Sequence, residues 1–168
     1  MALVLNTNSY VEIADADTYF ETRIDSANWF DATDEVREQS LVTATWLVDD
    51  REWIGSAVSS SQALAWPRDN AIYNDHRLGM QVTVAKTEVP NAVKIAVYEQ
   101  ALHLINNEDV LTGSTQTFES IKVGSIQIQD ANGDVTRTPK IPHEVLKQIK
   151  PLVRRGSSAI GGGWWRAN

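Results

Sequence analysis

The sequence PNAVKIAVYEQALHLIN, residues 90–106, specifies one of the two long helices on which the predicted fold is built. Its apolar residues recur every three or four positions and make a broad face on a helix: Val93, Ala96, Val97, Ala101, Leu104 and Ile105. Pro90 suits the start of a helix, where its missing N–H has no partner to lose. The spacing therefore predicts a helix over about 91–106 with one face in the core.

A second long helix is predicted over 33–49. Thr33 is a favourable N-cap, and three acids follow it in the first turns: Asp34, Glu35 and Glu38. A stripe of four apolar residues follows them: Leu41, Ala44, Leu47 and Val48. Packed together, the two long helices would supply most of the core.

Two shorter helices flank this pair. Residues 12–24 place Ala16, Tyr19, Phe20 and Ile24 at helical spacing. Pro142 begins a last helix, in which four apolar residues share a side: Leu146, Ile149, Leu152 and Val153. Because Pro151 has no N–H to donate, this last helix is expected to kink or end there.

The remaining segments lack helical spacing. Residues 50–90 contain many turn formers, which predicts a long, mostly irregular excursion. In residues 118–138, Ile121 and Val123 alternate with polar residues, and Ile126 and Ile128 do so out of phase. The slip at residues 124–125 predicts a bulge or a break.

Asn132 and Gly133 form a strong hairpin-turn signal that would return the chain through 135–138. The predicted fold is mainly α: a small helical bundle with one β-hairpin and an extended C-terminal tail.

Length and composition predict one domain with an appendage, a helical domain over 1–155 and a docking tail over 156–168. The chain has no cysteine, which excludes disulfides and thiolate chemistry and favours an intracellular protein. No stretch approaches the roughly 20 apolar residues of a membrane span, so we expect a soluble protein with no membrane partner.

Charge is distributed unevenly along the chain. Residues 137–168 hold seven bases and one acid, whereas the remainder holds eight bases and 21 acids, and the net charge is −7. An acidic body with a basic end can pair head to tail with copies of itself or with an acidic partner. The balance disfavours sequence-independent binding to nucleic acid, which needs cations to replace the phosphate counterions.

The C-terminal tail combines this positive charge with paired indoles. Trp164 and Trp165 follow three glycines and precede Arg166. Leaving both indoles in water is unfavourable, so a flexible tether with an aromatic anchor indicates docking on another protein. The docking residues predicted are Arg154, Arg155, Gly161, Gly162, Gly163, Trp164, Trp165 and Arg166.

Catalytic and metal-binding patterns are not apparent. No nucleophile elbow, phosphate loop or dinucleotide fingerprint occurs, and the three histidines lack ligand spacing. Residues 130–134 resemble part of a calcium loop, but a hairpin turn explains them better. Trp29, Trp46, Trp53 and Trp66 are predicted core residues rather than a base-stacking platform. We therefore expect no enzyme, no cofactor and no metal.

Five motifs follow one another along the chain: SYVE at 9–12, ADADTYF at 14–20, LAWPR at 64–68, EVP at 88–90 and IKVGSI at 121–126. In this order they resemble those of the head–tail adaptor (connector, or head-completion) proteins of tailed bacteriophages. The related sequences are often described as DnaT-like single-stranded-DNA-binding proteins. The resemblance covers roughly residues 9–153.

The resemblance implies a structural virion protein at the head–tail junction, assembled in the host cytoplasm. It would form a homo-oligomeric ring of twelve copies under the portal protein and extend the DNA exit channel. Genomic DNA would pass through without specific binding, and a tail or nozzle protein would follow. The hairpin residues Ile126, Ile128, Asn132 and Gly133 would contact a neighbouring copy or the tail protein. A single-stranded-DNA-binding replication accessory protein is the alternative.

Overall fold

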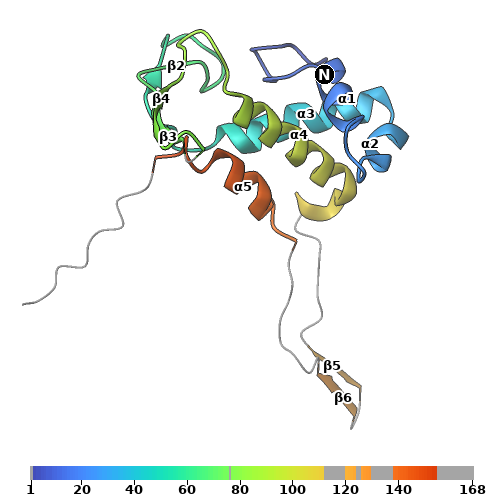
Figure 1. Ribbon diagram of the computed structural model, residues 1–168. Helices are drawn as coiled ribbons and strands as arrows, with labels where there is room; N and C mark the ends of the chain where they lie inside the picture. Colours follow the sequence, from blue (N-terminus) through green and yellow to red (C-terminus); the bar gives the residue numbers. More distant parts are fainter. Residues whose placement is uncertain (1, 76, 112–119, 124–125, 130–137, 155–168) are drawn as a thin grey trace, which may run out of the picture.

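The computed structural model describes residues 2–75, 77–111, 120–123, 126–129 and 138–154. Helix α4 (Asn91–Asn106) lies at the centre and packs against α2 (Ala27–Asp31), α3 (Asp34–Asp49), α5 (His143–Ile149) and the 3-10 turn η1 (Glu108–Val110) (Figure 1). Helix α1 (Ile13–Phe20) packs against α3. The fold is mainly α, as the sequence predicts.

Both long helices begin and end where the sequence places them. The Thr33 side chain accepts a hydrogen bond from the Val36 N–H at 3.4 Å, and Pro90 occupies the N-cap of α4. The buried residues of the two helices form the centre of the core, and they include Leu41, Ala44, Val48, Val93, Ala96, Val97, Ala101 and Leu104. The helical period alone selected these faces correctly.

An aromatic cluster attaches α1 and α2 to α4. The Phe20 ring lies 4.8 Å from that of Trp29, and the Tyr19 ring stacks on Tyr98 at 4.9 Å. Helix α1 is shorter than the predicted 12–24, because the chain turns after Phe20. The prediction that Ile24 belongs to its apolar face is therefore wrong, and this side chain is fully exposed.

The excursion after α3 contains more regular structure than predicted. Strand β1 (Ser56–Ala57) pairs with β2 (Arg68–Asp69), and β3 (Ile72–Asp75) pairs with β4 (Met80–Thr83), both antiparallel. Sequence patterning missed the β3–β4 hairpin because each strand has only four residues and β3 begins with two adjacent apolar residues, Ile72 and Tyr73. Gly79 provides the positive φ, 64°, of the turn between them.

The predicted hairpin at 118–138 differs in register. Strand β5 (Ser120–Val123) pairs with β6 (Ile126–Gln129), with Ile121 opposite Ile128. The change of phase in the sequence therefore marks the reversal between two strands, so of the two predicted alternatives the break is confirmed and the bulge is wrong. The predicted turn at Asn132 and Gly133 and the returning residues 135–137 lie outside the described residues.

Helix α5 ends at Ile149, as Pro151 predicts. Its buried face consists of Val145 and Ile149 and continues into Leu152. Leu146 is 37% exposed, so its predicted place on the buried side is wrong. No helix in the described part of the chain is long and apolar enough to cross a lipid bilayer.

Three of the four tryptophans predicted to lie in the core are buried, and one is exposed. Trp29, Trp53 and Trp66 are buried, which confirms their core assignment. Trp46 is 67% exposed, so its core assignment is wrong. It lies two residues from both Ala44 and Val48, roughly 200° around the helix from each, and so faces away from the buried stripe.

Candidate functional site

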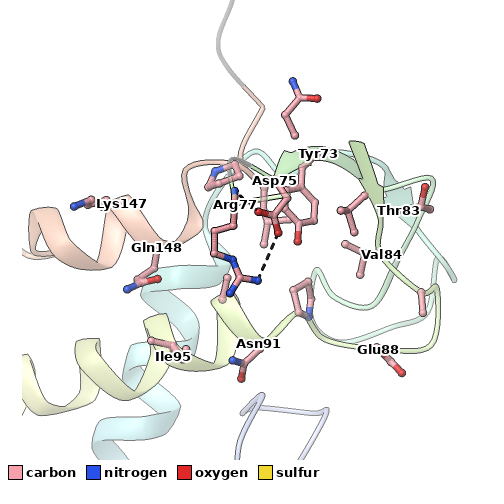
Figure 2. A pocket seen from close by; sticks show the side chains of 17 residues that line it. Tyr73, Asp75, Arg77, Thr83, Val84, Glu88, Asn91, Ile95, Lys147 and Gln148 are labelled. Carbon is pink, nitrogen blue, oxygen red and sulfur yellow. Dashed lines mark hydrogen bonds and ion pairs between the residues drawn. The ribbon is translucent and has the colours of Figure 1, made fainter. Parts of the chain in front are cut away.

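A hollow surface lies between the β3–β4 hairpin and the end of α5. It consists of two adjoining hollows of about 740 and 820 Å³, which share Tyr73, Asn74, Lys147 and Pro151. We call them together the hairpin groove. Figure 2 shows Lys147 and Gln148 on one side of the first hollow and Thr83 and Val84 on the other.

The wall formed by the hairpin is held by the turn between β3 and β4. The Asp75 carboxylate accepts the backbone N–H groups of Arg77 at 2.8 Å and Leu78 at 3.3 Å. These hydrogen bonds, with the nearby Arg77 charge, lower the pKa of Asp75. The Arg77 guanidinium also pairs with Asp75 at 3.7 Å, the contact drawn in Figure 2. The opposite charges of Asp75 and Arg77 therefore largely cancel in the turn.

The opposite wall is fixed by backbone hydrogen bonds to the segment that follows α3. Ile54 donates its N–H to the Leu152 carbonyl at 3.0 Å, and Arg154 donates its N–H to the Glu52 carbonyl at 2.6 Å. Ile149 and Leu152 point into the core. Lys147, Lys150 and Arg154 are exposed along the groove.

A buried polar network supports the segment beneath the groove. The Tyr10 hydroxyl donates to the Asp49 carboxylate and accepts the Trp66 N–H at 3.0 Å. The Ala65 N–H donates to both Asp49 oxygens at 3.1 Å. Burial raises the pKa of Asp49 and that of Tyr10. The network joins the N-terminal segment, the end of α3 and the loop before β2.

Arg68 extends this support toward the groove. Its guanidinium donates to the carbonyls of Ile54 at 2.7 Å, Gly55 at 2.9 Å and Ala65 at 3.2 Å. Burial away from water lowers the pKa of Arg68, and the positive charge of Arg154 contributes to this. Since Ile54 lines the groove, Arg68 positions part of its apolar floor.

The groove gathers positive charge on an acidic protein. Residues 2–75 hold four bases and fourteen acids, whereas residues 138–154 hold four bases and one acid. Within the described chain, Lys147, Lys150 and Arg154 form no ion pair. Three unneutralised cations beside apolar side chains make a surface that accepts an anionic partner.

The predicted docking residues meet this groove at one position. Arg154, the last residue that the structure describes, lines it. Arg155, Gly161, Gly162, Gly163, Trp164, Trp165 and Arg166 lie outside the described residues, as do Asn132 and Gly133. Ile126 and Ile128 lie in β6.

Sequence reasoning missed Tyr73, Lys147 and Lys150 as members of a site. The excess of bases near the C-terminus was a signal for the two lysines, but the hairpin opposite them was not predicted. Groups of three or more His, Cys, Asp or Glu side chains suited to a metal ion do not occur in the described part of the chain.

One comparison with known proteins gave a match. A family model with the description "Putative DnaT-like ssDNA binding protein" matches residues 2–164. No curated protein and no solved structure matches the chain significantly.

Proposed function

The chain belongs to the family described as "Putative DnaT-like ssDNA binding protein". We propose that, within this family, it is a head–tail adaptor of a tailed bacteriophage. In this role it is a structural virion protein that forms a ring under the portal and extends the DNA exit channel. Its tail, residues 156–168, docks on the portal. The adaptor identity rests on the resemblance of the sequence motifs and on the arrangement of charge.

The single observation that carries the proposal is the separation of a basic groove from an acidic body. Fourteen of the acids lie in residues 2–75, which build α1 to α3 and the loops after them. A surface of this sign repels phosphates, so DNA in a channel slides past it. The groove and the basic tail that follows Arg154 supply the attractive surface for another protein.

Burial of the aromatic residues favours protein assembly over base stacking. Trp29, Trp53 and Trp66 are 0–4% exposed, and Trp46 stands on a helix whose first turn holds Asp34 and Glu35. A platform for single strands needs exposed aromatic rings among lysines and arginines. Within the described residues, Tyr73 is the half-buried aromatic ring of the groove, whereas Tyr19, which has Arg23 over its ring at 5.7 Å, is already stacked on Tyr98.

The portal of the phage that encodes this chain provides the test. Wild-type protein mixed with that portal is expected to co-sediment and to appear as an added ring in electron micrographs. The double variant Trp164→Ala/Trp165→Ala should lose at least about tenfold in affinity, because the two indoles supply most of the apolar area of the tail.

Trp46→Ala is the matched control, since it removes an exposed indole from the body and should bind the portal normally. Equal binding by the double variant, or no binding by the wild type, would contradict the proposal.

Single-stranded-DNA binding is the second candidate, favoured by the description of the family. The hairpin groove is then the binding surface, with Lys147, Lys150 and Arg154 on phosphates and Tyr73 beneath a base. Anisotropy with an oligonucleotide of about 30 nucleotides would show affinity that falls steeply between roughly 50 and 200 mM salt. Lys147→Glu/Lys150→Glu would abolish it. Binding that is absent at low salt removes this candidate.

A further inference from the structure

A hollow separate from the hairpin groove lies at the far end of the central helices. It has a volume of about 600 Å³ and lies where the start of α3 meets η1 and the end of α4. Val36 and Leu111 line it and are 43% and 40% exposed, beside the more buried Leu104 and Ile105. We call this surface the helix-end hollow. Its apolar floor is open to water.

The helix-end hollow is acidic, whereas in the lining of the hairpin groove four bases outnumber the two acids, Asp75 and Glu88. Asp31 and Glu108 line it, and no base is among its lining residues. Glu35 is exposed in the first turn of α3. The nearest arginine along the chain, Arg37, is held by Asp17 at 2.9 Å and by Asp34. Its charge is therefore largely neutralised.

The hairpin groove and the helix-end hollow lie at opposite ends of α4. Asn91 and Ile95 from the start of the helix line the hairpin groove, and Leu104 and Ile105 from its end line the helix-end hollow. A helix of 16 residues is about 24 Å long. In Figure 1, β3 and β4 lie at the left of the molecule and α2 at the right. One copy thus presents surfaces of opposite charge at its two ends.

We propose that the helix-end hollow docks the hairpin groove of a second copy of this chain. Asp31 and Glu108 of one copy face Lys147 and Lys150 of the next. The exposed Val36 and Leu111 meet apolar side chains of the groove such as Ile72, which is 48% exposed. Opposite charges steer the approach and set the register, and the apolar floors supply the free energy of burial.

Such a contact joins two different surfaces, so a growing chain of copies always keeps one free groove at one end and one free hollow at the other. A contact of this kind closes into a ring or continues as a filament. The inference rests on the proposed function, because it names the contact from which the adaptor ring would be built. The contact also makes self-association depend on the charges of the two surfaces, so variants with exchanged charges can test it.

A charge swap tests the contact. The groove variant is Lys147→Glu/Lys150→Glu, and the hollow variant is Asp31→Lys/Glu108→Lys. All four residues are exposed, so both variants should keep the wild-type circular dichroism spectrum. Full-length proteins are compared by sedimentation velocity at roughly 50 and 500 mM salt, where the screening length falls several-fold.

Wild-type protein is expected to self-associate at the lower salt, and more weakly at the higher salt. Each variant alone should be at least about tenfold weaker, since like charges then meet in the contact. An equimolar mixture of the two variants should regain association, because opposite charges meet again. Lys86→Glu/Lys140→Glu makes the same change of charge outside both hollows and should associate like the wild type.

Three results would overturn the inference: a wild type that is monomeric at low salt, variants that associate as the wild type does, or a mixture that stays monomeric. Portal binding is measured separately. A chain that joins the portal without this contact refutes only the inference, whereas a chain that self-associates in this way but ignores the portal refutes only the adaptor role.

Discussion

The hydroxyl of Tyr10 donates a hydrogen bond to the carboxylate of Asp49, which lies 39 residues later at the end of α3. The same hydroxyl accepts the Trp66 N–H, so one oxygen connects three segments distant in sequence. Because Tyr10 and Trp66 are buried, water cannot replace these bonds. The supporting loop of the hairpin groove depends on them.

Removing this hydroxyl should destabilise the fold. Tyr10→Phe leaves the Trp66 N–H without its acceptor and Asp49 without one donor, which costs about 1–3 kcal/mol. Urea unfolding followed by fluorescence measures the loss. Tyr98→Phe is the control, since Tyr98 is also a buried residue but its hydroxyl has no hydrogen-bond partner among the described residues. Equal losses in the two variants would contradict the role of the network.

The half-buried carboxylate of Asp49 should give stability a defined dependence on pH. Burial raises the pKa of Asp49 in the folded protein, so the folded state binds this proton more tightly than the unfolded state. Its contribution to the free energy of unfolding is therefore largest below the unfolded pKa and falls as pH rises through the folded pKa. The measurement is the free energy of unfolding as a function of pH. Subtracting the Asp49→Asn profile from the wild-type profile isolates the contribution of the Asp49 carboxyl group.

The pKa of Asp75 is shifted in the opposite direction, so this residue serves as a comparison. Backbone hydrogen bonds lower its pKa in the folded protein, so its contribution is present above the unfolded pKa and is lost as pH falls through the folded pKa. The wild-type minus Asp75→Asn difference should therefore rise with pH. Two differences with the same slope would refute the assignment.

Two glycines with positive φ should tolerate alanine very differently. At Gly55, φ is 71° and an added Cβ would lie 2.4 Å from the Asp69 carbonyl oxygen, inside the β1–β2 pair. Gly79 has a φ of 64° but open space around it. Gly79→Ala should cost about 1–2 kcal/mol for the left-handed backbone alone, and Gly55→Ala clearly more. Thermal melts of both variants check the order, and similar midpoints would contradict the close approach.

Two tryptophans should differ sharply in their effect on stability. Trp29→Ala removes a fully buried ring and the hydrogen bond from its Nε1 to Asp17, so a loss of about 3–5 kcal/mol is expected. Trp46→Ala removes a mostly exposed ring and should change stability by no more than about 0.5 kcal/mol. Chemical denaturation measures both, and a large loss for Trp46→Ala would show that its exposed position is wrong.

The candidate site was predictable in part. Its positive charge is visible in the sequence, because Lys147, Lys150 and Arg154 follow an acidic body. The hairpin that forms the opposite wall was not predictable, since both strands are only four residues long and β3 begins with two adjacent apolar residues, Ile72 and Tyr73. The outward place of Trp46 was in principle readable, because its angle from Ala44 and Val48 follows from the helical period.

Helices α3 and α4, with their N-caps and buried faces, could be read from the amino-acid sequence, because a helix is specified by local hydrogen bonds and a repeat of 3.6 residues. The path of residues 50–90 and the choice of basic side chains that share a groove could not. Those features depend on contacts such as Tyr10 with Asp49 and Ile54 with Leu152. Contacts of this range leave no period in the chain, since their partners lie 39 and 98 residues apart.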